Sequence, residues 1–308
     1  MNELTIIMYH YVRPINGSKF PGIKGLEVKA FSRQLDFLQN NFSIISSDQV
    51  IDAVINNKVL PKNPCWLTFD DGYKDHFNYV LPELLKRNLS AAFFPPKAII
   101  KDNKILDVNL IHHILNYSID MNILISELRE KCIKFGIKKD QIDEYYNEYG
   151  IASRFDNADT VFFKRMLQHV LPEEIRNSIT STFFDKYVGI PEDKFSKKLY
   201  MNVDEIRKLI SCGMYVGSHG SMHYWLNQMN YQKQKEDISA SLEFLEEIGA
   251  PTKNWIMCYP YGAYNDTTIS VLKELGASIG ITVEPRKAIL GMDHSLKLPR
   301  LDTNDFPQ

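Results

Sequence analysis

The sequence lacks the features that mark several protein classes. Its four cysteines are scattered without a CxxC pair, which argues against a disulfide framework and favours reduced thiols. No apolar run approaches the roughly 20 residues that span a bilayer. Basic residues number 36 against 38 acidic ones, so the net charge of −2 gives no general electrostatic reason to expect a nucleic acid or an anionic membrane as partner.

A basic amino-terminal region of the signal-peptide kind is also missing, because the segment before His10 carries an acid, Glu3, instead. We therefore expect a cytoplasmic protein without a signal peptide or a transmembrane segment. The 308 residues, of which 44% are hydrophobic and 24% charged, suffice for one large domain or two small ones with a sizeable core.

Short apolar runs typical of buried strands alternate with amphipathic stretches typical of helices over two parts of the chain. Strands are expected at 4–9, 42–45, 65–69, 91–94, 214–216, 255–258, 278–282 and 296–298. Helices are expected at 28–40, 47–56, 75–87, 204–210, 232–248 and 267–275. This alternation predicts an α/β fold with a parallel sheet covered by helices, and about eight strands favour closure into a barrel of the (β/α)₈ type.

Residues 101–200 interrupt this rhythm with helical periodicity and no convincing strand. Because the segment has enough apolar residues to pack, it is interpreted as a helical insertion and not as a linker. A lid, a dimerisation surface and a docking site for a lipid-linked or nucleotide-linked sugar are the roles left open for it. The oligomeric state is not predicted.

The string Thr68-Phe69-Asp70-Asp71-Gly72 follows an apolar strand. Asp-Asp-Gly alone is typical of a tight turn, because Asp bonds its own backbone and Gly accepts positive φ. The carboxyl ends of parallel strands are, however, where such folds carry their sites, so two adjacent carboxylates with different roles are also expected here. His76, just beyond, fits a supporting role or an exposed helix start equally well.

Two further strand ends carry polar or aromatic motifs. His219 and His223 follow the expected strand at 214–216, and their i, i+4 spacing predicts that they share one side of a helical turn and chelate one metal. One Asp with two His leaves coordination positions open, as a catalytic metal requires. Pro260-Tyr261-Gly262 follows the strand at 255–258, where it is also typical of a plain turn.

Together these motifs resemble the polysaccharide deacetylase family, carbohydrate esterases with a NodB-like domain. The resemblance covers residues 1–100 and 201–308 and rests on TFDDG at 68–72, on the H-S/T-x-x-H pattern at 219–223 and on Pro-Tyr at 260–261. Gly220 departs from that pattern, since Ser or Thr usually follows the first His. The family implies a distorted (β/α) barrel of the NodB-like type, here with the 101–200 segment as a helical insertion.

The resemblance also implies a role for each matching residue. Asp71, His219 and His223 bind the metal, with Zn²⁺ expected and other divalent transition metals as alternatives. Asp70 is the base that takes a proton as a metal-bound water attacks an acetamide carbonyl. The metal and the backbone N–H of Tyr261 stabilise the resulting oxyanion. The expected substrate is an N-acetylated sugar or glycan, although cleavage of an O-acetyl ester is left open.

The acid and the arginine of the common family pattern are absent from their usual places. A subgroup similar to the poly-N-acetylglucosamine deacetylases has a permuted order, with the acid His in an amino-terminal Tyr-His motif and the Arg in a late Leu-Pro-Arg motif. Tyr9-His10 and Leu298-Pro299-Arg300 match that order. His10 is therefore expected to protonate the leaving amine and Arg300 to hold Asp70 ionised. His294 is the rival acid.

Aromatic residues beside the motifs are candidates for stacking on sugar faces, although aromatics at a barrel mouth are often packing residues. The expected substrate contacts are Tyr11, Tyr73, Tyr224, Trp225 and Pro260. Two other functions fit part of the pattern. A non-haem Fe(II) oxygenase uses two His and a carboxylate but leaves the adjacent Asp pair without a purpose, and a catalytically silent carbohydrate-binding protein could keep the same fold.

Overall fold

The computed structural model describes residues 3–117 and 120–308, and the chain divides into two compact units. The first, called here the barrel unit, consists of Met1–Pro14, Gly25–Lys104 and Ser196–Gln308. The second, the helical unit, consists of Ile15–Lys24 and Ile105–Phe195. No pattern in the sequence indicated that the short segment Ile15–Lys24 groups with the helices and not with the strands.

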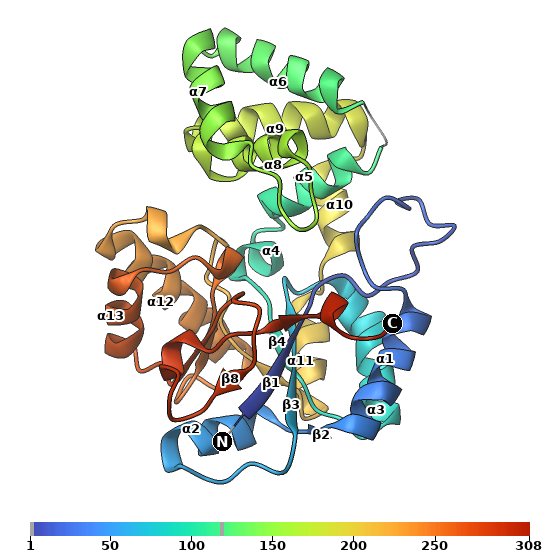
Figure 1. Ribbon diagram of the computed structural model, residues 1–308, viewed down its shortest axis with the longest axis vertical. Coiled ribbons are helices and arrows are strands. Elements are labelled where there is room, and N and C mark those ends of the chain that lie inside the picture. Colours follow the sequence, from blue (N-terminus) through green and yellow to red (C-terminus); the bar gives the residue numbers. More distant parts are fainter. Residues whose placement is uncertain (1–2, 118–119) are drawn as a thin grey trace. The chain divides into compact units, whose positions relative to one another are not determined.

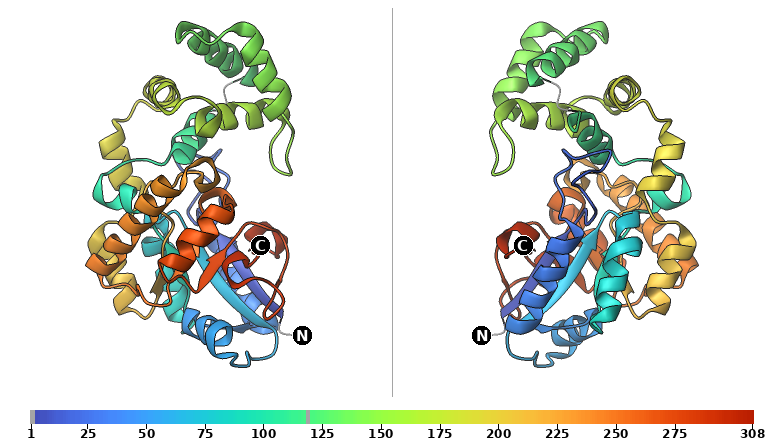
Figure 2. Two further views of the ribbon diagram at one scale, coloured as in Figure 1. Left: turned by 90° about the vertical axis from the view of Figure 1, so that its left-hand side faces the viewer. Right: turned by 90° about the vertical axis from the view of Figure 1, so that its right-hand side faces the viewer.

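Parallel strands form the main sheet of the barrel unit, as Figures 1 and 2 show for β1 and β3. Its strands are β1 (Glu3–Tyr9), β2 (Ser43–Ile44), β3 (Pro64–Asp70), β4 (Ala92–Phe94), β5 (Tyr215–Val216), β8 (Ala288–Ile289) and β9 (Leu301–Asp302). The order β5-β4-β3-β1 is parallel throughout, β2 pairs with β3, and β9 pairs with β1. Only β8 runs antiparallel, against β1, among the strands described.

Two single bridges close these strands into a distorted barrel. The remaining strands, β6 (Ile256–Cys258) and β7 (Ile279–Ile281), form a parallel pair. Ser218, just beyond β5, bridges to Met257 in β6, and Ile281 in β7 bridges to Leu298, just before β9. The strand expected at 296–298 is therefore wrong, because Ser295–Lys297 forms a 3₁₀ turn and only Leu298 pairs.

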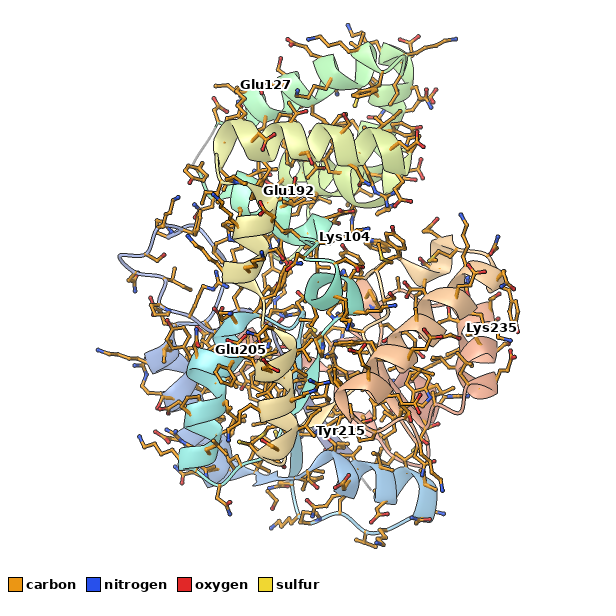
Figure 3. All side chains as sticks on the ribbon, turned by 180° about the vertical axis from the view of Figure 1, so that it is seen from behind. Lys104, Glu127, Glu192, Glu205, Tyr215 and Lys235 are labelled. Atoms are coloured by element: carbon orange, nitrogen blue, oxygen red, sulfur yellow. The ribbon has the colours of Figure 1, made fainter. Side chains whose placement is uncertain are left out.

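Most helices expected in the barrel unit are confirmed with shifts of a residue or two. They are α1 (Val28–Asn41), α2 (Ser47–Asn56), α11 (Val203–Ser211), α12 (Tyr231–Ile248) and α13 (Asp266–Glu274). The α-helix expected at 75–87 is shorter, because α3 spans only Leu81–Lys86, and α4 (Lys97–Lys101) was not predicted. A π-helical turn, His76–Val80, precedes α3. Side-chain caps fix several starts: Ser46 caps α2, and Asn202 with Glu205 closes a capping box at α11. Figure 3 labels Glu205 on α11.

Alternation along the strands separates two apolar layers. Cys65, Leu67 and Phe69 of β3 pack in a cluster with α1, α3 and α11. Trp66 packs in a second cluster with residues of β1, β4, β6 and β7, which is the barrel interior. Since side chains alternate across a strand, Asp70 points into that interior at the carboxyl end of β3. This register places a carboxylate inside the barrel mouth.

The helical unit has a core of its own. Its helices are α5 (Asp107–Leu115), α6 (Met121–Lys134), α7 (Lys139–Tyr149), α8 (Ala158–Arg165), α9 (Glu173–Tyr187) and α10 (Glu192–Leu199), with a π-helical turn at Met166–Val170. Phe162, Phe163 and Phe183 are fully buried, and Phe20 meets the rings of His113 and Phe195 edge-on. Across the described residues, none of the helices has the length and apolarity required for a membrane span.

Candidate active site

The residues singled out from the sequence lie at the ends of four strands of the barrel unit and, in one case, just before a fifth strand begins. They are His10 after β1, Asp70 and Asp71 at the end of β3, His219 and His223 after β5, Pro260 and Tyr261 after β6, and Arg300 before β9. Strand ends of a parallel barrel share one rim, so side chains far apart in the sequence converge there. Three groups within this rim have distinct chemistry.

The first group is a donor set for a metal ion. The Oδ1 atom of Asp71 lies 3.4 Å from Nε2 of His219 and 3.3 Å from Nε2 of His223, and all three side chains are buried. Within the described residues Oδ1 has no hydrogen-bond partner. Bonds of about 2.1 Å in a tetrahedral zinc site place neighbouring donors about 3.4 Å apart. The buried, unpartnered oxygen and the spacing of the donors therefore fit a metal such as Zn²⁺.

The ionisation state of Asp71 agrees with this fit. Burial alone would raise the pKa of Asp71, but the neighbouring His219 and His223 side chains hold it well below its usual value. Nδ1 of His219 is 2.7 Å from the backbone oxygen of Cys258, which leaves Nε2 to face Asp71. A negative oxygen and two imidazole nitrogens are thus aimed at one point.

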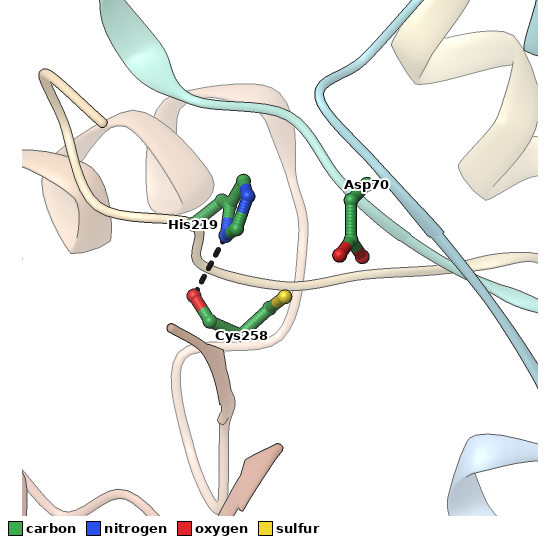
Figure 4. A group of neighbouring side chains, drawn as sticks. All are labelled: Asp70, His219 and Cys258. Atoms are coloured by element: carbon green, nitrogen blue, oxygen red, sulfur yellow. Dashed lines mark hydrogen bonds between the residues drawn. The ribbon is translucent and has the colours of Figure 1, made fainter. Parts of the chain in front are cut away.

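A second cluster, Asp70 with His219 and Cys258, also brings possible ligand atoms within 4.8 Å of one another (Figure 4). It does not fit a metal. Both oxygens of Asp70 already accept hydrogen bonds from the guanidinium of Arg300, and Nη2 of Arg300 is 3.3 Å from the Cys258 sulfur. Nδ1 of His219 is already engaged, because it lies 2.7 Å from the Cys258 carbonyl oxygen. A cation placed there would meet the arginine charge directly.

Left-handed backbone conformations shape the donor set. Asp71, His223 and Tyr261 have φ values of 68°, 57° and 58°, which are uncommon for residues with a side chain. Such conformations cluster at functional sites, where the surrounding structure maintains them. The expected helical turn between His219 and His223 is wrong, because the segment is an irregular loop with Gly220 at φ 69°. The two imidazoles converge through loop geometry and not through helical spacing.

Asp237 on α12 holds this loop. Its carboxylate is buried and accepts hydrogen bonds from the backbone N–H groups of Ser221 at 3.0 Å and Met222 at 2.8 Å. On the other side, the Ser221 carbonyl accepts a bond from the N–H of Ala98. A Cβ atom on Gly220 would stand 2.7 Å from Oδ2 of Asp237, which explains why this sequence has glycine where the family pattern has Ser or Thr.

Replacing Gly220 with alanine is therefore expected to disturb the metal loop. The methyl group meets the Asp237 carboxylate, and alanine at φ 69° adds a cost of about 1–2 kcal/mol. We expect a lower midpoint of thermal unfolding and weaker Zn²⁺ binding, measured by calorimetric titration. Gly213→Ala is the matched control, since Gly213 has φ 82° but nothing within 4 Å of the added carbon. Equal Zn²⁺ affinity in both variants would contradict this explanation.

The second group is a buried ion pair. Nη1 and Nη2 of Arg300 bond to the two oxygens of Asp70 at 2.9 and 2.8 Å. Arg300 is itself fixed, because Nε donates to the Thr282 carbonyl and Nη1 also donates to the Thr68 hydroxyl. Burial alone would raise the pKa of Asp70, but the Arg300 charge lowers it to about 2. Asp70 is therefore a carboxylate at any physiological pH.

The third group is His10. Its side chain is 41% exposed, and Nε2 lies 3.9 Å from Oδ2 of Asp70. The backbone oxygen of His10 is 2.8 Å from Nε2 of His76. His76 is fully buried, so the alternative of an exposed helix start is wrong. Its position beyond the Asp-Asp-Gly turn gave a hint of a supporting role, but nothing in the sequence indicated burial.

The rival acid, His294, has a local structural role. It is exposed and precedes the 3₁₀ turn Ser295–Lys297, where its Nδ1 accepts a hydrogen bond from the backbone N–H of Leu296. This contact accounts for the histidine without catalysis.

The aromatic residues fall into two sets. Tyr11 and Tyr73 are 4% and 1% exposed and stack on each other with centroids 4.1 Å apart, so neither turns an open ring face to solvent. Trp225 and Tyr261 are half-buried and stack on each other at 4.6 Å, and Tyr224 is also half-buried. Pro260 is buried. The ring of Tyr261 also lies 4.6 Å from that of His223, next to the metal donor set.

Comparison with known proteins identifies a family model that part of the chain matches. Residues 145–280 match the family model described as Polysaccharide deacetylase. That range contains His219, His223, Pro260 and Tyr261 but not His10, Asp70, Asp71 or Arg300, whose grouping rests on the geometry above.

One curated relative and two solved structures are similar to the chain. YxkH of Bacillus subtilis (strain 168), itself only provisionally described as a polysaccharide deacetylase, is 21% identical over 159 residues. That alignment covers 52% of this chain and 47% of YxkH, so the chain spans about half the length of this relative. The deacetylase PplD of Streptococcus pyogenes, solved with acetate, has a TM-score of 0.60 at 16% identity over 97% of this chain and 92% of PplD. IcaB of Ammonifex degensii has a TM-score of 0.59 at 17% identity over 98% of this chain and 92% of IcaB.

At these identities the solved structures establish the fold, a distorted barrel of the NodB-like type. The resemblance to the polysaccharide deacetylase family that the three motifs predicted is confirmed.

Proposed function

We propose that this chain, as a protein of the polysaccharide deacetylase type, is a metal-dependent hydrolase that removes N-acetyl groups from a sugar or glycan. The observation that carries the proposal is the meeting, at one barrel rim, of a three-donor metal site, a carboxylate kept ionised by a buried arginine, and a half-exposed imidazole. Zn²⁺ is the proposed metal because one carboxylate and two imidazoles suit it and leave a position open.

Asp71, His219 and His223 would hold the metal ion, which when bound acidifies a coordinated water and polarises a carbonyl. Asp70 lies next in sequence to a ligand and is the proton acceptor, because Arg300 keeps it ionised and fixes both of its oxygens. General-base assistance of this kind typically contributes 10²–10⁴-fold in rate.

His10 is the proposed proton donor to the departing amine. Because the His10 side chain is partly exposed, its imidazole can contact a substrate. Its Nε2 lies 3.9 Å from Asp70, so the proposed proton donor, His10, and the proposed proton acceptor, Asp70, are in the same site. The amide C–N bond breaks, the carbonyl carbon gains the water oxygen, and the amine nitrogen takes the His10 proton. The backbone N–H of Tyr261 is the proposed hydrogen-bond donor to the carbonyl oxygen of the substrate, which becomes negatively charged after water adds and before the C–N bond breaks.

The sugar ring is proposed to contact Trp225, Tyr224 and Tyr261. These side chains are half-buried and adjoin His223, so they combine an accessible ring with closeness to the donor set. Because Tyr11 and Tyr73 are covered, we do not propose them as sugar contacts.

The decisive experiment measures acetate release from N-acetylated and O-acetylated sugars and oligomers by chelator-treated protein before and after Zn²⁺ is restored. We expect release from N-acetylated substrates that requires the metal. Glycan binding without acetate release would instead favour a silent carbohydrate-binding protein. Oxygen consumption with Fe(II) and no acetate would favour an oxygenase.

Arg300→Gln is expected to move the acid limb of kcat/KM to higher pH. Without the guanidinium, burial dominates and raises the pKa of Asp70, so the base becomes protonated at a pH where the wild type is still ionised. Breaking the buried pair also lowers the free energy of unfolding by about 3–5 kcal/mol near neutral pH. Arg300→Lys keeps the charge and is expected to shift the limb less. The control is Arg286→Gln, which changes a partly exposed arginine paired with Asp293. If the acid limb of kcat/KM did not move in Arg300→Gln, the role of Arg300 in keeping Asp70 ionised would be contradicted.

A further inference from the structure

The two oxygens of Asp71 have different surroundings. Oδ1 faces Nε2 of His219 and His223, whereas Oδ2 accepts a hydrogen bond of 2.7 Å from the hydroxyl of Tyr73. A carboxylate is a flexible ligand, since it binds a metal through one oxygen or through both. Here one of the two oxygens is already engaged by a neutral donor from the protein.

Tyr73 cannot easily turn away from Asp71, because its ring is fixed on both sides. It is 1% exposed, stacks on Tyr11 at 4.1 Å and lies parallel to Tyr200 at 6.0 Å. The backbones of Tyr73 and Tyr200 also form an antiparallel bridge. The hydroxyl position is therefore set by packing that does not depend on a metal.

A further layer supports this stack. The guanidinium of Arg13 lies 4.5 Å from the centre of the Tyr11 ring, and its Nε bonds to Asp75 at 2.6 Å. Tyr11, which stacks on Tyr73, is therefore itself held in place by a paired cation.

We propose that Tyr73 is a positioning residue that makes Asp71 a one-oxygen ligand. By engaging Oδ2, its hydroxyl presents Oδ1 alone to the metal and keeps a coordination position open for water and substrate, which a catalytic site needs. The inference rests on the metal site of the proposed function, and it gives Tyr73 a role behind a ligand instead of the substrate contact expected from the sequence.

The test compares Tyr73→Phe with Tyr9→Phe. Each substitution removes one buried tyrosine hydroxyl and its 2.7 Å hydrogen bond, but the Tyr9 hydroxyl bonds to Gln34, away from the donor set. Zn²⁺ affinity is measured by competition with a chromogenic chelator. We expect Tyr73→Phe to lose about 10–100-fold in affinity, the range typical of partners that orient metal ligands, and Tyr9→Phe to match the wild type.

A second readout follows the coordination of Co²⁺ put in place of Zn²⁺. If Oδ2 becomes a ligand once Tyr73 is phenylalanine, coordination number rises and the visible absorption of Co²⁺ weakens, whereas the Tyr9→Phe spectrum stays as in the wild type. A Tyr73→Phe protein with wild-type Zn²⁺ affinity overturns the inference whatever its spectrum.

Circular dichroism establishes that both variants fold. If Tyr73→Phe does not, Tyr73→Leu decides instead with Tyr9→Leu as its control, because each removes the same hydroxyl as its Phe variant: weaker Zn²⁺ binding in Tyr73→Leu alone supports the inference, and equal binding in the two overturns it. A wild type that binds Zn²⁺ and releases acetate, beside a Tyr73→Phe protein of equal affinity, overturns this inference alone. A wild type that binds no Zn²⁺ overturns the proposed function together with it.

Discussion

Asp70→Asn is expected to lower kcat/KM for acetate release by about 10³-fold, within the 10²–10⁴ that a positioned general base contributes. Asparagine keeps the shape and one oxygen acceptor for Arg300 but cannot take a proton from water. Because Asp70 lies outside the proposed donor set, the zinc content, measured by elemental mass spectrometry, should equal that of the wild type. Normal zinc with lost turnover would locate the defect in proton transfer.

A matched control separates the base from the ion pair. Asp293→Asn makes the same substitution in another Asp–Arg pair, where both oxygens of Asp293 accept hydrogen bonds from Arg286 at 2.9 and 2.8 Å. Both variants leave an arginine without its full partner, so both should unfold at lower temperature. Only Asp70→Asn should lose turnover. An Asp70→Asn protein that retains more than a tenth of wild-type activity would refute Asp70 as the base.

Asp71→Asn, one residue further on, is expected to abolish both zinc binding and acetate release. Asparagine tolerates the left-handed conformation at φ 68° as well as aspartate does, so the backbone has no reason to change. Its amide can still accept the Tyr73 hydrogen bond and can donate to an imidazole, whereas it is a poor ligand for Zn²⁺. The metal-free protein should unfold somewhat below the wild-type temperature, because asparagine lacks the charge that His219 and His223 stabilise.

The measurement is the midpoint of thermal unfolding with and without Zn²⁺. A ligand at 100 times its dissociation constant stabilises the folded state by about 2.7 kcal/mol, so the wild type should gain several degrees on adding the metal. Asp71→Asn should gain nothing, and Asp70→Asn should gain as much as the wild type. Two adjacent aspartates with the same substitution would then differ in zinc response, and an equal response in both would refute the division of roles.

Much of the barrel was predictable because each strand and helix has a strong local signal. The apolar run before Asp70 and the amphipathic face of α1 are examples, and both were placed within a residue or two. The antiparallel strand β8 and the last pairing at Leu298 were missed or misassigned, since runs of one or two paired residues have no periodicity to detect. Closure of the barrel depends on these short contacts.

The residues of the site also fall into those that the sequence indicated and those that only the folded structure revealed. Residues in short motifs, such as Asp71 and His223, were indicated by their position after a strand and by the resemblance of those motifs to the family pattern. Asp237, Tyr73 and His76 act through hydrogen bonds to a loop backbone, to another side chain or to a carbonyl, and such partners are fixed only by the fold. Gly220 was noticed as a departure from a pattern, but its reason became visible only with the Asp237 carboxylate beside it.

The pairing of β1 with β9 has a consequence for how the molecule matures. Ile7 lies opposite Leu301, so the strand that carries His10 and the segment that carries Arg300 are neighbours although almost the whole polypeptide separates them. During translation the proposed metal ligands leave the ribosome before Arg300 does, and until then the Asp70 carboxylate lacks the guanidinium that the folded chain pairs with it. The growing chain thus acquires its proposed zinc donors before its proposed base is paired. We expect loss of the segment that carries Arg300 to leave the chain in that earlier stage.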